Sequence, residues 1–546
     1  MRPVGTTTVD SSVTDPDTVG GQVYTDSKYS SDRAAAANSV EMAGDREEAA
    51  EEEYYDSSAE GEVSTQCCCG GLSPTVVVYM SAFVSSLTSV LLGYDVGVVS
   101  GAIKYIQADF DLTTLQEGVF VSSLNLVAAG GGLIAGSVSD TLGRKWSIAA
   151  ACLVFITGSI IKISAQSFGV LLLGRVLTGV GVGCGFVVAP VYIAEITPAH
   201  VRGRLTALTD ISINMGIVLG YLVAFAVAAT VSGDSGKWRT MLGISIVPPF
   251  IILSSLCLLP ESPRWLLGRG RESEALAVLY TIVPTKDQAK RELDEMKVVA
   301  GEEANGKATW SELLCSVSPA LRATVMLGLG LGIAQQASGS EALVYYSPSV
   351  LKDAGLASDS AQLGGNILVG LSKLGGEFVS FCLVDRFGRR PLFIISSSMV
   401  TFFLVLLGIM FSASAPGWMT LTGLCLFMLF FSLGMGALTF LVAAEIFPLR
   451  YRGRGVSLTV FVNRLTSGLV ALAFPLLETV LTAGTTFYLF TVFSVGTVWF
   501  YTKIPETKDR TLEEISAQAS KEVAEHDTAT ALGLAAVAPP GTMDAL

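Results

Sequence analysis

Apolar residues form long blocks along most of this chain, separated by short polar segments. A helix needs about 20 apolar residues to cross a bilayer, and its backbone groups must bond within the segment. The pattern therefore predicts an all-α membrane protein. Its twelve membrane-spanning helices are expected near 75–99, 118–138, 146–164, 168–191, 205–230, 239–259, 321–347, 361–384, 391–413, 417–443, 455–480 and 484–503.

Basic residues follow alternate spans. They come after spans 2, 4, 8 and 10, as Arg144 and Lys145, Arg202 and Arg204, Arg386, Arg389 and Arg390, and Arg450, Arg452 and Arg454. The opposite loops are expected to carry only Lys104, Lys162, Lys237, Arg239 and Lys352. Short cytoplasmic loops are enriched in Lys and Arg, so we expect both termini in the cytoplasm.

Three motifs recur in the same order in the second half of the chain. The segment 140–145 (DTLGRK) is echoed at 385–390 (DRFGRR), and 194–204 is echoed at 444–454 by an Ala-Glu-Ile followed by Arg-Gly-Arg. A Pro-Glu pair at 260–261 returns at 505–506. This predicts two six-helix halves, at 73–259 and 321–504, joined by a cytoplasmic loop with short helices at 260–320.

The two ends of the chain differ from the spans. Residues 1–72 hold 15 Asp and Glu against 4 Lys and Arg, which is a net charge of −11 out of −13 for the chain. Such a segment cannot bury enough apolar area to fold alone, so we expect a disordered cytoplasmic tail, and a second tail at 505–546. Cys67, Cys68 and Cys69 precede the first span, where palmitoylation or an unmodified tail are both open.

Composition narrows the function classes. Hydrophobic residues make up 51% of the chain and charged residues 15%, and there are two histidines. The sequence has no GxxxxGK[ST] loop and no zinc-ligand cluster. We therefore expect no enzymatic activity, no cofactor, no metal and no nucleic-acid partner.

The repeated polar motifs lie at the predicted cytoplasmic ends of the spans. Carboxylates and guanidiniums there can pair and close that face, although interfacial charges that only set topology are an alternative. The candidate gate residues are Asp140, Arg144, Glu195, Arg202, Arg204, Glu261 and Arg264 in the first half, and Asp385, Arg389, Glu445, Arg452, Arg454 and Glu506 in the second.

Several short motifs together resemble the sugar porter family of the major facilitator superfamily. They are Gly93-Tyr94-Asp95, the two GR[KR] loops, the PRWL segment at 263–266, Gln335-Gln336 with the YYSP segment at 345–348, and Pro505-Glu506-Thr507. Polyol and monosaccharide–proton symporters look most similar, because of an acid in span 7 (Glu341), a lysine in span 8 (Lys373) and the segment 462–468. The resemblance implies the major facilitator fold.

Ionisable residues deep in a span are costly and usually functional. Asp95 lies in span 1 and Arg175 in span 4. The family resemblance implies that these two form the proton-coupling pair. A static ion pair that locks helices together is the alternative.

A sugar site needs amides, hydroxyls and aromatic rings. Span 7 can break at Ser338-Gly339, just after Gln335 and Gln336. The resemblance and the helical spacing give the candidate substrate residues Gln335, Gln336, Glu341, Tyr345, Asp210, Asn214, Lys373, Phe440 and Asn463. Lys373 can pair with Glu341 or with Glu377, and the sequence does not choose.

Two positions in span 10 and one in span 5 depart from the family pattern. Phe440 stands where Trp is common, and Ala437 stands where Pro is common, so span 10 is expected to bend less. Asp210 occupies a place where Gln or Glu is usual.

The sequence thus predicts a proton-coupled symporter for a monosaccharide or polyol that works by alternating access. A passive uniporter on the same fold and a non-transporting sugar receptor are the alternatives. We expect a monomeric transport unit in the lipid bilayer, with the plasma membrane favoured over a vacuolar or other organelle membrane.

Overall fold

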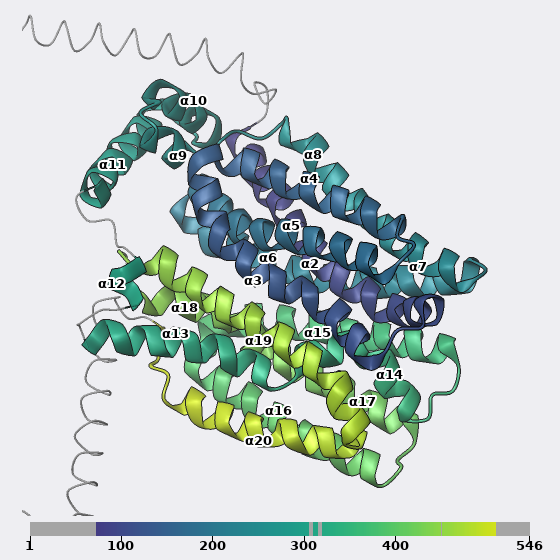
Figure 1. The fold of residues 1–546 in the computed structure, drawn as a ribbon. Helices are drawn as coiled ribbons and strands as arrows, with labels where there is room; N and C mark the ends of the chain where they lie inside the picture. The colour runs from purple at the N-terminus through teal and green to yellow at the C-terminus, as the bar shows by residue number, and fades with distance from the viewer. Residues whose placement is uncertain (1–72, 305–309, 315–318, 449, 509–546) are drawn as a thin grey trace, which may run out of the picture. The chain divides into compact units, whose positions relative to one another are not determined.

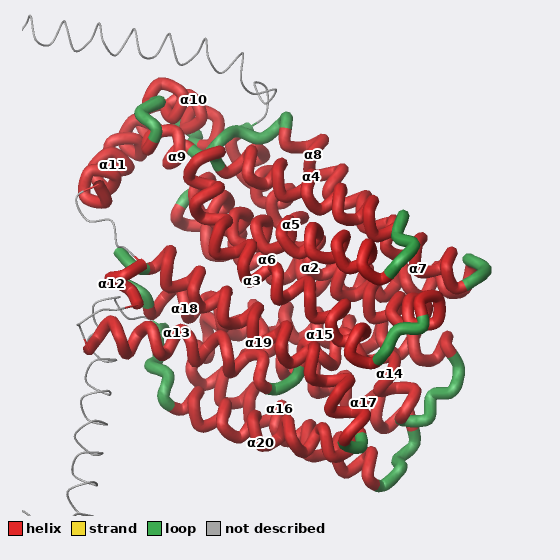
Figure 2. The backbone as a smooth tube through the Cα atoms, viewed as in Figure 1, coloured by secondary structure: helices red, strands yellow, loops and turns green. Residues whose placement is uncertain are grey.

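The computed structural model describes residues 73–304, 310–314, 319–448 and 450–508. The predicted tail 1–72, with Cys67–Cys69, and residues 509–546 of the second tail lie outside the described residues. Figure 2 shows that helices and short connecting loops make up the described part.

The first half contains the first six predicted spans. They are α2 (Pro74–Phe110), α3 (Thr114–Leu142), α4 (Arg144–Ile163), α5 (Phe168–Ile196), α6 (Ala199–Thr230) and a sixth span made of α7 (Asp234–Gly243), η1 (Ile244–Ile246) and α8 (Val247–Leu256). The first span is longer than the sequence predicts, because α2 continues past residue 99 to Phe110.

The second half repeats this order. It consists of α13 (Pro319–Ala337) with α14 (Ser340–Asp353), α15 (Asp359–Phe387), α16 (Arg389–Ser412), α17 (Gly417–Phe431) with η2 (Ser432–Gly436) and α18 (Ala437–Ile446), α19 (Arg452–Val480) and α20 (Ala483–Thr502). Among the described residues, 11 helices are long and apolar enough to cross a membrane. The remaining predicted span is the seventh, which breaks between α13 and α14.

The break in the seventh span confirms the prediction at Ser338-Gly339. Gly339 has φ 74°, a left-handed conformation that only glycine adopts readily, and it caps the N-terminus of α14. Span 10 is interrupted as well, by the π-helix η2, although it has no proline at Ala437. Both irregular segments lie in the second half, near the middle of their spans.

Short helices connect the halves. They are α9 (Pro263–Gly268), α10 (Glu272–Ile282), α11 (Lys286–Ala304) and α12 (Trp310–Leu314). Apolar residues of α10, including Ala275, Leu276 and Leu279, are buried in the core.

The halves meet along three pairs of helices: α3 packs against α19, α6 against α15, and α2 against α14 (Figure 1). Near the C-terminus of α2, Lys104 Nζ lies 2.6 Å from Asp359 Oδ2 at the start of α15. This contact places both helix ends at one end of the structure, which we call the far end. Gly143 and Gly388, at the opposite ends of α3 and α15, therefore share the other end, which we call the motif end.

Glycines allow helices within the first half to approach closely. A Cβ on Gly216 of α6 would lie 2.5 Å from the Val90 carbonyl oxygen of α2. Between α4 and α5, a Cβ on Gly158 or Gly174 would lie 2.7 Å from the other glycine's carbonyl oxygen. Such contacts between small residues are typical of helix pairs in membranes, and here they fix α2, α4 and α5 around the polar side chains described below.

Candidate functional site

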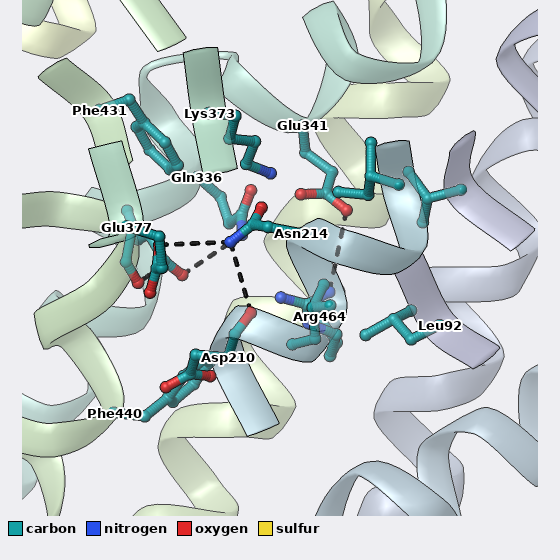
Figure 3. Close-up of a pocket in the computed structure, with 15 residues that line it drawn as sticks. Leu92, Asp210, Asn214, Gln336, Glu341, Lys373, Glu377, Phe431, Phe440 and Arg464 are labelled. Atoms are coloured by element: carbon teal, nitrogen blue, oxygen red, sulfur yellow. Dashed lines mark hydrogen bonds and ion pairs between the residues drawn. The ribbon is translucent and has the colours of Figure 1, made fainter. Parts of the chain in front are cut away.

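A cavity lies between the two halves. Residues of both halves line it, from α2 and α6 of the first half and from α13, α14, α15, α17, η2, α18 and α19 of the second. The lining residues are Leu92, Val96, Asp210, Ile213, Asn214, Ile217, Gln335, Gln336, Glu341, Lys373, Glu377, Phe431, Gly436, Phe440 and Arg464. Figure 3 shows their polar ends directed into one space.

The amides on one side of the cavity form a connected network. Gln335 Nε2 donates to the carbonyl oxygens of Met435 (2.9 Å) and Gly436 (3.0 Å), which belong to the π-helix. Asn463 Nδ2 donates to Gln335 Oε1 at 2.6 Å, and Gln336 Nε2 donates to Asn463 Oδ1 at 3.3 Å. The break in span 7 and the π-helix in span 10 are therefore joined through Gln335.

Two amide oxygens of the cavity wall have no hydrogen-bond partner in the described structure. They are Gln336 Oε1 and Asn214 Oδ1. Asn214 Nδ2 does have a partner, because it donates to Glu377 Oε2 across the two halves at 3.2 Å (Figure 3). A buried acceptor without a donor is unfavourable, so each oxygen would gain a hydrogen bond from a hydroxyl group that reached it.

Charged side chains gather in the same space. Arg464 Nη1 lies 3.9 Å from Glu341 Oε1. Lys373 has no ion pair within 4 Å among the described residues, and its ammonium lies 5.9 Å from the centre of the Phe431 ring. Neither of its two predicted partners, Glu341 or Glu377, therefore takes it as a direct ion pair in this conformation.

An aromatic wall completes the cavity. Phe440 lies edge-on to Phe186 of α5, with ring centroids 5.7 Å apart. The guanidinium of Arg464 lies 5.4 Å from the centre of the same Phe186 ring. Phe440 thus offers an apolar face to the cavity without a polar hydrogen.

Seven of the nine predicted substrate residues line this cavity. The other two are Tyr345 and Asn463, which are buried behind the wall. Tyr345 lies toward α3, where its hydroxyl accepts from Asn125 Nδ2 at 3.4 Å. Asn463 supports Gln335 and Gln336 instead of facing the cavity.

A second polar cluster lies inside the first half, and it brings together both residues predicted for proton coupling. Asp95 Oδ2 accepts from Arg175 Nη1, and Asp95 Oδ1 accepts from Lys162 Nζ at 2.8 Å. All three side chains are 0% exposed. The sequence-based assignment of Lys162 to a loop is wrong: it lies in the last turns of α4 and faces inward.

At the motif end, each half carries the same set of contacts. In the first half Arg144 donates to both carboxylate oxygens of Glu195 at 2.9 Å, and Ser262 Oγ donates to Glu195 at 2.5 Å. The Glu261 carboxylate accepts from the backbone N–H of Arg144 at 2.9 Å, at the N-terminus of α4. This arrangement satisfies helix N–H groups and places a negative charge at the positive end of the helix dipole.

The second half repeats these contacts 245 to 250 residues later. Arg389 Nη2 donates to Glu445 at 3.0 Å, Thr507 Oγ1 donates to Glu445 at 2.5 Å, and Glu506 accepts from the N–H of Arg389 at 2.9 Å. The same residue pairs thus meet in both halves, although Arg389 makes one hydrogen bond to Glu445 where Arg144 makes two to Glu195. We call each set of contacts a latch, and each latch joins helices of its own half.

The two latch carboxylates that cap helices, Glu261 and Glu506, have pKa values shifted in opposite directions. Burial raises the pKa of Glu261 above its ordinary value, although backbone N–H groups act against this. Burial also acts to raise the pKa of Glu506, but the N–H groups of Lys508, Arg389, Arg390 and Thr507 hold it below its ordinary value. The first latch therefore takes up a proton at a higher pH than the second.

The other predicted gate residues lie around the latches. Asp140 pairs with Arg144 at 3.1 Å. Arg202 donates to the Thr197 carbonyl, and Arg454 lies 5.9 Å from the centre of the Trp310 ring. Arg204 and Arg264 are exposed, and Arg452 Nε has no partner in the described structure. The side chain of Asp385 lies outside the described residues.

Most of the chain matches a known protein family. The family described as "Sugar (and other) transporter" matches residues 81–519. The chain belongs to this family. It is therefore a multi-pass membrane transporter of the major facilitator superfamily and not an enzyme, and this confirms the fold and family expected from the sequence.

Individual proteins that are similar to this chain also have names that describe them as transporters. "Probable polyol transporter 4" of Arabidopsis thaliana is 40% identical over 445 residues, which are 80% of this chain and 84% of that protein. "Polyol transporter 5" of the same plant is 37% identical, with 80% and 85% covered. The "Probable metabolite transport protein CsbC" of Bacillus subtilis is 34% identical, with 81% and 95% covered.

Solved structures give the same fold. The proton:xylose symporter XylE bound to 6-bromo-6-deoxy-D-glucose has a TM-score of 0.71 at 27% identity, over 81% of this chain and 99% of that one. The inward open conformation of the xylose transporter XylE from E. coli has a TM-score of 0.70 at 26% identity, over 81% and 99%.

Three charged residues of these sites were not selected from the sequence as site residues. Glu377, named only as a possible partner of Lys373, and Arg464 line the cavity, and Lys162, assigned to a loop, completes the Asp95 cluster. Each falls inside a predicted span, which is the signal that selected Asp95 and Arg175. Applied uniformly to every span, that signal would have found all three.

Proposed function

We propose that this chain carries a monosaccharide or polyol across a membrane together with a proton. The observation that carries the proposal is the cavity between the halves, with its two unpartnered amide oxygens, next to a fully buried acid. The substrate would bind in the cavity, and the halves would rock around it so that the cavity opens to each side in turn.

The cavity suits a hydroxyl-rich guest. Sugar hydroxyls donate and accept, so they match Gln336 Oε1 and Asn214 Oδ1 as well as the nearby carboxylates and Lys373. The C–H face of a sugar would lie against Phe440 or Phe431. The similarity to polyol transporters and to a proton:xylose symporter supports the same substrate class.

The buried Asp95 cluster supports coupling to protons. A carboxylate sealed among cations can drive transport only if its ionic contacts change during the cycle. A passive uniporter, in which this cluster merely locks α2, α4 and α5, is the second candidate, and full burial of all three side chains favours it as long as they stay together.

We propose further that the motif end faces the cytoplasm of a cell whose plasma membrane holds the protein. The basic loops lie at this end. Two side-chain contacts between the halves, Lys104 to Asp359 at 2.6 Å and Ser100 to Asn366 at 3.0 Å, lie toward the far end, beyond the Asn214–Glu377 contact at the cavity. The conformation therefore corresponds to one closed toward the outside.

The test is uptake by the purified full chain in proteoliposomes with an imposed pH gradient. D-glucose, D-xylose, myo-inositol and D-sorbitol form the panel. For a symporter that moves one proton per substrate, each unit of pH difference supports up to about tenfold accumulation of a neutral substrate. Uptake that only equilibrates, with or without the gradient, would identify a uniporter.

Asp95→Asn is the matched variant. It keeps the size of the side chain and removes its charge. We expect exchange of labelled for unlabelled substrate to continue and uphill accumulation to disappear. Undiminished accumulation by this variant would refute coupling through the Asp95 cluster.

A further inference from the structure

Lys162 gives the buried cluster one more positive charge than negative. Its ammonium lies 2.8 Å from Asp95 Oδ1, while Arg175 binds Oδ2, so each oxygen of the single carboxylate already has a cation. Among the described residues, Asp95 is the only hydrogen-bond acceptor of Lys162. The cluster therefore holds two cations and one anion with no water-exposed atom.

The packing around Lys162 is specific. Its aliphatic stem lies against Gly174, where a Cβ would meet Lys162 Cγ at 2.8 Å. Its ammonium lies 5.6 Å from the centre of the Phe155 ring. Arg175 in turn donates Nε to the Phe120 carbonyl of α3 at 3.2 Å, and its Nη2 has no partner in the described structure. Both cations are thus built into the first half.

Other titratable groups around the cluster do not balance the charge. Arg239 of α7 adds a further cation, although it is engaged by the Ile163 and Ala165 carbonyls at the end of α4. Tyr94 of α2 donates its hydroxyl to the Met241 carbonyl. Tyr345 of α14 interacts electrostatically with Asp95 and Arg175 and is neutral at ordinary pH.

The excess of positive charge in the cluster indicates which side chain can exchange a proton at the lower electrostatic cost. Adding a proton to Asp95 would leave Lys162 and Arg175 both charged, buried and without an anion, which is the most costly arrangement. Removing a proton from Lys162 would leave one anion and one permanent cation, Arg175, as a neutral pair. The second change lowers the buried charge and keeps a hydrogen bond between the amine and Asp95.

We propose that the proton carried with the substrate resides on the amine of Lys162, with Asp95 as its anionic partner and Arg175 as the fixed counter-charge. In one step of the cycle Lys162 –NH₃⁺ releases H⁺ and becomes –NH₂, and in the other it takes up H⁺ from the opposite side. Asp95 stays ionised throughout. The inference rests on the proposed proton-coupled function and assigns the proton to one residue within it.

The helix α14 links the cavity to the first half. It carries Glu341 in the cavity wall and, one turn later, Tyr345. Asn125 of α3 donates to the Tyr345 hydroxyl, so α14 contacts the first half at this point. Movement of α14 as a substrate binds would change the surroundings of Asp95 and Lys162 together.

Two variants test the proposal in proteoliposomes, with the panel sugar or polyol that the wild type takes up fastest. Lys162→Arg keeps the positive charge but cannot release a proton. Lys162→Met keeps the length and removes the charge, leaving the Asp95–Arg175 pair. We expect both variants to exchange labelled substrate at constant pH and to lose uphill accumulation driven by a pH gradient.

The pH profile gives a second readout. Wild-type exchange should depend on pH, whereas exchange by Lys162→Arg should not, because a guanidinium stays charged over the whole range. If the proton resided on Asp95 instead, Lys162→Met would still accumulate substrate uphill, and that result would overturn the proposal. Loss of exchange as well as accumulation in both variants would also overturn it, since Lys162 would then be a structural lock.

Failure of this inference is distinguishable from failure of the proposed function. If the wild type itself does not accumulate substrate, proton coupling is wrong for the whole chain. If the wild type and Lys162→Met both accumulate substrate, coupling holds and only the assignment to Lys162 falls.

Discussion

The neighbouring residues Gln335 and Gln336 of the cavity wall differ in their hydrogen bonding. Both amide hydrogens of Gln335 are used by the carbonyls of Met435 and Gly436, and its oxygen accepts from Asn463. Gln336 keeps a free oxygen at the cavity. Gln335 therefore holds the wall together, and Gln336 is the one free to bind.

Replacing each glutamine by alanine should separate these duties. Gln336→Ala should raise KM about tenfold, the equivalent of about 1.4 kcal/mol, with little change in stability. Gln335→Ala should lower the free energy of unfolding by roughly 2 kcal/mol, because the hydrogen bonds from its amide to two buried carbonyls and from Asn463 to its oxygen are lost. Concentration-dependent uptake and thermal unfolding in detergent measure the two effects. An unchanged KM for Gln336→Ala would show that its oxygen does not contact substrate.

At the scale of helices, the irregular segments position the site. The break at Gly339 separates α13, which carries the glutamines, from α14, which carries Glu341. The π-helix η2 contains Met435 and Gly436, whose carbonyl oxygens accept hydrogen bonds from Gln335. Regular helices in both places would satisfy these backbone groups internally and leave Gln335 without them.

Gly339→Ala tests the break. A side chain here would adopt φ 74° and would also meet Phe490 Cδ1 at 2.9 Å. Gly270→Ala is the matched control, because Gly270 has the same φ and no atom within 4 Å of its Cβ position. We expect the control to lose about 1 kcal/mol and Gly339→Ala to lose about 2–4 kcal/mol together with most transport. Equal losses in unfolding experiments would mean that contact with Phe490 is unimportant.

The sequence predicted helices and repeats well because their signals are local. Apolar blocks located the spans, and the echo between residues 140–145 and 385–390 located the latches. Which way a side chain faces within an apolar span depends instead on the rotation of the helix, which packing sets. For this reason Lys162 was assigned to a loop, and Arg464 and Glu377 were not selected as cavity residues. For the same reason Asn463 and Tyr345 were expected to face the cavity, although both are buried behind its wall.

For the whole molecule, the polar contacts between halves are unevenly distributed. In the described residues, Lys104 to Asp359, Ser100 to Asn366 and the Tyr221 hydroxyl to the Val344 carbonyl join the halves toward the far end. The latches at the motif end join helices within each half. Opening the far end would therefore break contacts between halves, whereas the latches lie within each half and would stay intact.

The Lys104–Asp359 pair lets this distribution be tested without touching the cavity. Its side chains are 31% and 63% exposed, so it should contribute no more than about 1 kcal/mol to far-end closure. Lys104→Asp places two like charges together and should favour a conformation open at the far end. The readout is labelling of the cavity variant Ile217→Cys by an impermeant thiol reagent, which should be roughly 2–5 times faster.

The reversed pair separates a specific contact from a general charge effect. Adding Asp359→Lys to Lys104→Asp restores opposite charges and should return labelling to its original rate. Asp234→Lys provides the comparison, because Asp234 pairs with Lys237 at 3.9 Å inside the first half and spans no moving interface. That variant should leave labelling unchanged. If it accelerated labelling as much as Lys104→Asp does, the far end would respond to surface charge alone, and the Lys104–Asp359 contact would have no part in holding it closed.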